Sequence, residues 1–121
     1  MYTVKFYRDK DGNEPLREYL KKLSKNKDKD SRINLTKIRD YVKALSLYGK
    51  ALGEPYIKHI EGEIWELRPL RNRIFFFGYD GDQFILLSHF IKKTQKTPQR
   101  EIDKAKRLMN DYLERSKESE Q

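Results

Sequence analysis

Two groups of basic residues could do chemistry on a phosphate. Arg68, Arg71 and Arg73 flank one short turn, and the loop Lys92–Lys96 follows a strongly apolar run. Between positions 92 and 107, seven Lys or Arg stand against two acidic residues. Arginine binds phosphate at two points and stays charged, whereas lysine can accept or donate a proton. This set fits cleavage of RNA through its own 2′-hydroxyl, which needs a base, an acid and cations around the developing phosphorane.

Other titratable side chains near these groups have both a catalytic and a structural interpretation. Glu66 stands two residues before Arg68, so on a strand both side chains point to one face. Glu66 could therefore accept the 2′-proton or pair with an arginine across the sheet. His59 is a weaker candidate for the base. His89 lies in an apolar run, where a histidine is more often a buried structural residue than a catalyst or an RNA contact.

Contacts to RNA are expected from residues around the same set. Arg71 and Lys96 could hold phosphates, although exposed cations of this kind are most often plain surface. The aromatic run at 75–79 is first of all core. One exposed ring, Tyr79 or Phe75, could nevertheless stack on a base, as aromatic side chains do in proteins that bind single strands.

Composition narrows the class of protein. The 121 residues include 27 Lys and Arg against 19 Asp and Glu, a formal charge of +8 that favours a polyanionic partner. There is no cysteine, and the two histidines and scattered carboxylates lack the spacing of a metal site, so we expect neither metal nor cofactor. No signal peptide or membrane span is visible, so we expect a cytoplasmic protein without a membrane partner.

The surrounding pattern predicts one α+β domain over residues 1–121. The expected elements are a strand at 2–8, helices at 15–23 and 33–47, a candidate short strand at 56–60, strands at 64–68, 73–79 and 84–91, and a helix from Thr97-Pro98 to Leu113. Asn13 and Thr97 are the expected helix caps. The order β-α-α-β-meander-α predicts a small antiparallel sheet packed by helices, with a frayed tail over 114–121.

This topology should bring the two basic groups together. A tight turn at Asp80–Asp82 joins the last two strands into a hairpin. The start of the Arg73 strand must then lie beside the end of the strand that runs into Lys92. Cations that are distant in sequence are expected to meet at one end of the sheet.

Three segments resemble the HigB-like branch of the RelE/ParE toxin superfamily. They are Ile64–Arg68, Arg73–Phe77 and Leu87–Pro98, with Ala105 downstream, and the similarity runs in order over about residues 2–113. The resemblance implies a RelE-like fold and the toxin of a bacterial type II toxin–antitoxin pair. Such toxins are endoribonucleases, or mRNA interferases, that cleave messenger RNA on the ribosome and stop translation. A cognate HigA-like antitoxin with a helix-turn-helix domain neutralises them.

The same resemblance implies roles for single residues. Arg73 matches the arginine that acts on the scissile phosphate, and Lys92 or Lys93 matches the basic residue that acts on the leaving group. Arg68 stands where a further active-site cation is common. RelE has lysines where this chain has Ile64 and Glu66, and it has a C-terminal aromatic that this chain lacks. The identity of the general base therefore stays open.

Two other functions fit the same features. A ParE-like toxin would have this fold but would inhibit DNA gyrase by binding, without enzymatic activity. A plain RNA- or ribosome-binding module would use the charge only to dock. Cleavage is favoured because Arg73 is expected to meet Lys92 and Lys93. The basic surface also predicts an acidic antitoxin segment that lies over the Lys92 region.

Overall fold

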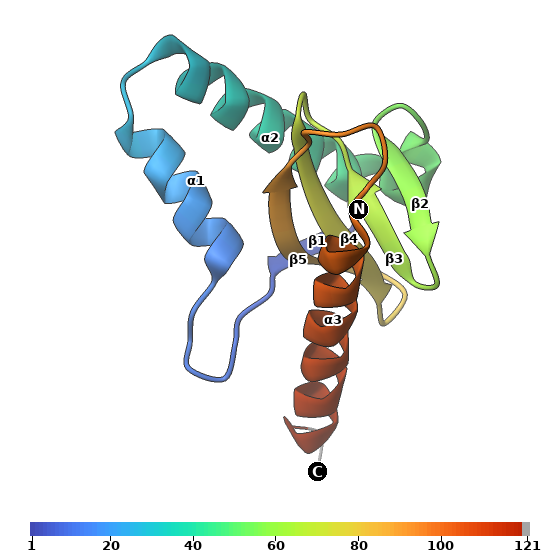
Figure 1. The fold of residues 1–121 in the computed structure, drawn as a ribbon. Helices are drawn as coiled ribbons and strands as arrows, with labels where there is room; N and C mark the ends of the chain where they lie inside the picture. The colour runs from blue at the N-terminus through green and yellow to red at the C-terminus, as the bar shows by residue number, and fades with distance from the viewer. Residues whose placement is uncertain (120–121) are drawn as a thin grey trace.

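A five-stranded sheet with helices on both faces forms the molecule (Figure 1). The computed structural model describes residues 1–119. Its strands, in the sheet order β1-β5-β4-β3-β2, are β1 (Thr3–Phe6), β5 (Gln83–Ile91), β4 (Asn72–Tyr79), β3 (Ile64–Leu67) and β2 (Ile57–Glu61). Its helices are α1 (Pro15–Lys25), α2 (Lys29–Tyr48) and α3 (Gln99–Ser119), with a short 3-10 turn at Gly49–Leu52. The predicted α+β class and order of elements are confirmed.

The sheet is mixed rather than wholly antiparallel. Strands β2 to β5 form the expected antiparallel meander, whereas β1 pairs in parallel with β5, Thr3 opposite Gln83 and Phe6 opposite Leu86. Tight turns make neighbouring strands antiparallel, but the first strand reaches the sheet only after a long crossover through α1 and α2. Its direction depends on that crossover, which the local pattern of the sequence does not specify.

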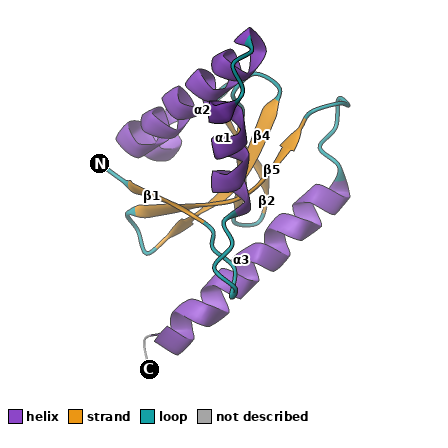
Figure 2. Ribbon diagram, turned by 90° about the vertical axis from the view of Figure 1, so that its left-hand side faces the viewer, coloured by secondary structure: helices purple, strands orange, loops and turns teal. Residues whose placement is uncertain are grey.

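Successive side chains of β4 enter two separate cores. Ile74 and Phe76 pack against α1 and α2, whereas Phe75 and Phe77 pack toward α3, and all four are buried. Figure 2 shows α1 and α2 on one side of the sheet and α3 on the other. Because helices cover both faces, the central strands are apolar on both sides, as their sequences predicted.

Both predicted helix caps are wrong. The residue before α1 is Glu14, which makes no side-chain capping bond, and the Asn13 amide binds the Asp9 carboxylate in the preceding loop. Before α3 the Thr97 hydroxyl donates to Glu66, and among residues 1–119 no backbone N–H of the first turn of α3 donates to that hydroxyl. In both places a nearby carboxylate offers the polar side chain a stronger partner than the helix end does.

The last helix continues beyond the predicted fraying point at residue 114. It runs to Ser119, and residues 120–121 lie outside the described part of the chain. Asp111 pairs with Arg115 one turn later at 2.8 Å and accepts a hydrogen bond from Tyr7, and Arg115 also donates to the Arg8 carbonyl. These contacts with the loop after β1 stabilise the last turns of α3, which have little apolar surface to bury.

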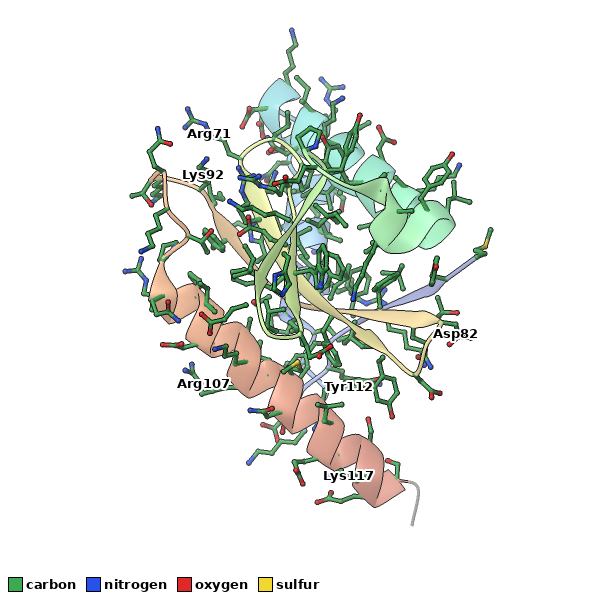
Figure 3. All side chains as sticks on the ribbon, turned by 90° about the vertical axis from the view of Figure 1, so that its right-hand side faces the viewer. Arg71, Asp82, Lys92, Arg107, Tyr112 and Lys117 are labelled. Atoms are coloured by element: carbon green, nitrogen blue, oxygen red, sulfur yellow. The ribbon has the colours of Figure 1, made fainter. Side chains whose placement is uncertain are left out.

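The meander brings the two basic segments together as predicted. Asn72 lies opposite Ile91, and the Lys92 backbone N–H donates to the Arg71 carbonyl at 2.8 Å. Figure 3 shows Arg71 and Lys92 at one end of the sheet and Asp82 at the other.

Candidate active site

An open hollow of about 510 Å³ lies where β4 begins and β5 ends. Its lining is polar throughout and consists of Arg71, Arg73, Lys92, Lys93, Thr94 and Gln95. Four of these six side chains are cationic, and no acidic residue of the described chain is among them. Such a surface concentrates anions, and it suits a phosphate more than an apolar ligand.

Arg73 is held firmly at the edge of this hollow. The side chain is only 7% exposed, and its Nη1 donates to the carbonyl oxygens of Leu70 at 2.8 Å and Asn72 at 2.9 Å. Within residues 1–119 no protein group accepts a hydrogen bond from Nη2. One side of the guanidinium is therefore fixed by the backbone while the other keeps donors for a ligand.

Arg73 stays positively charged although it is buried. Desolvation and then the neighbouring Arg68 charge lower the pKa of Arg73, while Glu66 opposes that shift. A guanidinium starts from a pKa so far above neutrality that it remains protonated. Arg73 therefore brings a fixed, poorly hydrated positive charge to the hollow.

The turn that holds Arg73 has an unusual backbone. Leu70 has a φ of 59°, in the left-handed region that side chains other than glycine rarely adopt. Its carbonyl is one of the two that accept from Arg73. The conformation thus directs an acceptor toward the guanidinium at some cost in local strain.

Glu66 lies beneath the two arginines of this face. One carboxylate oxygen is 3.4 Å from Arg68 Nε and 3.7 Å from Arg73 Nε, and the other accepts from the Thr97 hydroxyl at 3.3 Å. The Arg68 Nε makes no hydrogen bond, so these are contacts between charges rather than directed bonds. Burial raises the pKa of Glu66, and the charges of Arg73 and Arg68 oppose that rise.

The position of Glu66 limits what it can do. Its side chain is 1% exposed, and Thr97 contacts it from the loop before α3. A general base must come within hydrogen-bonding distance of the proton that it removes. Glu66 contacts both arginines and is not among the residues that line the hollow.

The opposite face of the same sheet end holds a neutral network around Asn72. Its Oδ1 accepts from the Tyr19 hydroxyl at 3.1 Å and from His89 Nε2 at 3.0 Å. Its Nδ2 donates to Asn34 Oδ1 at 2.8 Å and to the Pro69 carbonyl at 3.2 Å. The network connects β4 to α1, to α2, to β5 and to the turn that precedes β4. It therefore fixes the backbone from which Arg73 projects.

His89 belongs to this network and not to the hollow. Its ring stacks on Tyr19 with centroids 3.9 Å apart, and burial lowers the pKa of His89 to about 4. The imidazole is therefore neutral near pH 7 and donates from Nε2. The predicted RNA contact by His89 has no geometric support, because Ile74, its partner in β4, faces α1 and α2.

Three further candidates also lie away from the hollow. Tyr79 ends β4 beside the far turn and packs edge-on against Tyr112 at 5.2 Å. Phe75 is fully buried. His59 contacts Trp65 on the other face at 5.1 Å and hydrogen-bonds the Gly62 carbonyl. The hairpin pattern predicted which end of the sheet carries the basic residues, but alternation along strands did not show which face of the sheet these three side chains occupy.

The predicted basic loop is divided in the structure. Lys92 is half-buried and Lys93 exposed, and both line the hollow with exposed Arg71. Lys96 is exposed farther along the loop and does not line it. Arg68 is half-buried and does not line the hollow. It contacts the Glu66 carboxylate, which in turn contacts Arg73.

Two residues of this face were missed by the sequence analysis. Phe90 lies opposite Arg73 in the β4–β5 ladder, is half-buried and packs on Phe75 at 5.5 Å. Lys58 lies opposite Glu66 and adds a positive charge near it. Counting back in steps of two from Lys92 would have placed Phe90 on the Arg73 face, since alternate residues of a strand share a face.

No trio of His, Asp or Glu side chains within residues 1–119 is placed to bind a metal ion. In the same part of the chain, no helix has the length and apolar character needed to cross a membrane.

Comparison with known proteins adds one match. The family model described as "Phage derived protein Gp49-like (DUF891)" matches residues 18–110. The match extends from α1 into α3 and includes every residue that lines the hollow. No curated protein matches the chain.

Proposed function

The chain belongs to the Gp49-like family of phage-derived proteins, a RelE/ParE-like toxin family of toxin–antitoxin systems, and from this we propose that it is an endoribonuclease that cleaves messenger RNA. Within the RelE/ParE toxin superfamily we assign it to the HigB-like branch. We further propose that it acts on the ribosome, stops translation and is neutralised by a cognate helix-turn-helix antitoxin of the HigA type.

One observation carries the proposal. Arg73 has one edge bound by two backbone carbonyls, and it lines a hollow whose other cations are Arg71, Lys92 and Lys93. Fixed donors aimed at a developing negative charge stabilise a transition state more than they stabilise the ground state. A surface that only docks nucleic acid would not need a guanidinium held in this way.

We assign the chemical steps to the residues that a phosphate can reach. Arg73 binds the scissile phosphate, while Lys92 and Lys93 carry the two proton transfers, one from the 2′-hydroxyl and one to the leaving 5′-oxygen. The 2′-oxygen attacks phosphorus, the P–O5′ bond breaks, and a 2′,3′-cyclic phosphate and a 5′-hydroxyl result. Glu66 positions Arg68 and Arg73.

Phe90 replaces the earlier candidates for base stacking. It is the half-buried aromatic residue directly opposite Arg73 on the same face. Stacking on one aromatic ring is worth about 1–3 kcal/mol per base. Such a contact would fix the nucleotide next to the scissile phosphate, with Arg71 on a flanking phosphate.

Ribosome dependence follows from the openness of the hollow, which offers little to orient a flexible strand. A decoding-site conformation of the messenger can align the 2′-oxygen with phosphorus, and such positioning can lower a barrier by up to about 7–11 kcal/mol. The lysines and arginines then need only stabilise charge and move protons.

The test combines purified chain, programmed ribosomes and a defined messenger, with primer extension to locate cuts. Site-specific cuts should persist with excess EDTA when free magnesium is reset to keep ribosomes intact, and naked messenger should be cut far more slowly. The control is Lys117→Ala, since Lys117 is exposed on α3 away from the hollow (Figure 3). Absence of cutting on either substrate, with inhibition of DNA gyrase, would establish the ParE-like alternative instead.

A further inference from the structure

A second hollow, of about 430 Å³, lies beside β2, the strand at one edge of the sheet. Trp65 of β3 and His59 of β2 lie opposite each other in the ladder, and both line it. Its charged residues are Lys50, Lys58 and Glu54. We call this hollow the Trp65 pocket. An aromatic ring therefore stands close to both positive and negative side chains.

The Trp65 pocket is separate from the hollow beside Arg73. Trp65 packs against the core under α1 and α2, whereas Glu66, the next residue, points to the other face and contacts Arg73. The two hollows share no lining residue. A ligand in the Trp65 pocket therefore leaves the hollow beside Arg73 open.

One face of the Trp65 indole is covered by the exposed, flexible side chain of Lys50. The Lys50 Nζ lies 4.9 Å from the ring centroid, and Trp65 itself is half-buried. His59 meets the indole edge-on, with centroids 5.1 Å apart, and is held there because its Nε2 donates to the Gly62 carbonyl at 2.7 Å. Stacking of a nucleobase on an aromatic ring is stronger than the contact of an exposed cation with it. A base can therefore displace Lys50 from the ring.

The charged side chains of the Trp65 pocket are not engaged with one another. Lys50, Glu54 and Lys58 are exposed, and within residues 1–119 none of them makes an ion pair. The turn that carries Glu54 is held in place, since the preceding Gly53 carbonyl accepts from two backbone N–H groups of the turn, both at 3.1 Å. A carboxylate and an ammonium beside one ring can thus bind two polar parts of the same ligand.

We propose that the Trp65 pocket binds a guanine nucleotide, with its base stacked on Trp65, its Watson–Crick edge on Glu54 and its phosphate on Lys50. Guanine fits best because its Watson–Crick edge presents two adjacent N–H donors, which one carboxylate can accept together. Adenine, cytosine and uracil each present a single donor group at that edge. An apolar ligand would leave both charges of the pocket without a partner.

The same chemistry is present in a free guanine nucleotide and in an unpaired guanosine of an RNA strand. An RNA strand bound through such a guanosine would dock the chain without covering the hollow beside Arg73. The binding does not depend on cleavage of RNA, because none of its contacts involves a residue to which a catalytic step is assigned.

The test uses the fluorescence of Trp65, which is the only tryptophan of the chain. The full chain is titrated with guanosine, adenosine and uridine monophosphates (GMP, AMP and UMP), and amide NMR shifts locate each ligand. We expect GMP to quench the fluorescence saturably and to shift amides of residues 50–59 and 64–66. It should bind at least about tenfold more tightly than AMP or UMP.

A short oligouridine with one central guanosine, compared with the all-uridine oligomer, distinguishes the two sources. Tighter binding of the guanosine-containing oligomer than of GMP would identify an RNA strand as the source. Equal or weaker binding would identify the free nucleotide.

Variants test each assigned contact. Glu54→Gln keeps the size of the side chain but not its two acceptors, so GMP and AMP should bind this variant with affinities within about twofold of each other. Lys50→Glu should weaken GMP binding at least about tenfold. Lys37→Glu makes the same charge change on an exposed residue of α2 outside the pocket and should leave the affinity within about twofold. Arg73→Ala should also leave it within about twofold, since Arg73 lines the other hollow.

Three results would overturn the proposal. Equal affinities of GMP and AMP for the unaltered chain would rule out recognition of guanine. Loss of GMP binding in a folded Arg73→Ala variant, or shifts centred on Lys93, would place the nucleotide in the other hollow. Absence of a saturable change with GMP up to about 10 mM and with the guanosine-containing oligomer would reject the Trp65 pocket as a nucleotide site. A failure of ribosomal cleavage, in contrast, would contradict only the proposed function.

Discussion

Two adjacent residues at the start of β4 face opposite environments. Arg73 points to the α3 side, among the charges of Arg68, Glu66 and Lys92, with its two hydrogen bonds on one side of the guanidinium. Asn72 points to the α1 side, where its amide makes four hydrogen bonds to neutral partners. The face with Arg73 keeps hydrogen-bond donors free for a ligand, whereas the Asn72 side chain uses all of its donors and acceptors within the protein.

The difference separates the chemical role of this sheet end from its structural role. Charges that are incompletely paired destabilise a fold but can stabilise a transition state, whereas a satisfied neutral network stabilises the native state and gives a ligand nothing to bind. The Asn72 carbonyl also accepts from Arg73, so the neutral face fixes the backbone that the charged face uses. Substitutions on the two faces should therefore have effects of different kinds.

The largest effect should come from Arg73→Ala. Removing one fixed partner of the transition-state charge should lower the cleavage rate roughly 100-fold or more. Single-turnover cleavage on programmed ribosomes measures the loss, and urea unfolding checks that the variant folds. Arg73→Lys should recover only part of the rate, because lysine keeps the charge without the planar fork. Parental cleavage by a folded Ala variant would contradict the role.

The free energy of unfolding should depend on pH in a way that reveals the buried, neutral His89. In the folded chain its pKa is about 4, against an ordinary value of 6.5, so the stabilising effect is complete above pH 6.5. It is lost as the pH falls from 6.5 toward 4, because the unfolded chain binds the proton first. The loss should be about 2–3 kcal/mol, and His89→Gln, which can still donate to Asn72, should lack that part of the acid destabilisation. Urea titrations at pH 7, 5.5 and 4 compare the two proteins.

Asn72→Ala should act on stability more than on chemistry. The change leaves the Tyr19 hydroxyl, His89 Nε2 and Asn34 Oδ1 without their partner, and should cost about 2 kcal/mol of unfolding free energy. Cleavage should fall less than in Arg73→Ala, since the Asn72 carbonyl that binds Arg73 remains. A variant as stable as the parent would show that solvent replaces the network without cost.

Glu66→Gln should lower cleavage only about tenfold if the carboxylate orients the arginines, which corresponds to about 1.4 kcal/mol. The pH profile of the rate should keep its shape. Loss of a general base would instead cost about 100- to 10,000-fold and remove a limb of that profile. The rate and its pH dependence, measured together, therefore decide between the two roles of Glu66.

The sequence predicted the charged face better than the neutral one. A hairpin turn and alternation along two strands sufficed to bring Arg73 beside Lys92, because both depend on short-range geometry. The Asn72 network needs Tyr19 and Asn34 from two helices whose docking is set by packing at long range. The same limit explains why the sequence did not show that His59 and Tyr79 lie away from the hollow, or that Glu66 is buried.

The parallel pairing of β1 with β5 also sets the order of events during synthesis. Thr3 is made long before its partner Gln83, which follows both crossover helices and most of the meander. Contacts between such distant residues slow folding, and a domain that depends on them cannot close progressively from its N-terminus as it leaves the ribosome. A nascent chain that stalls before β5 therefore holds β1 without a partner, and the complete sheet forms only after β5 has been translated.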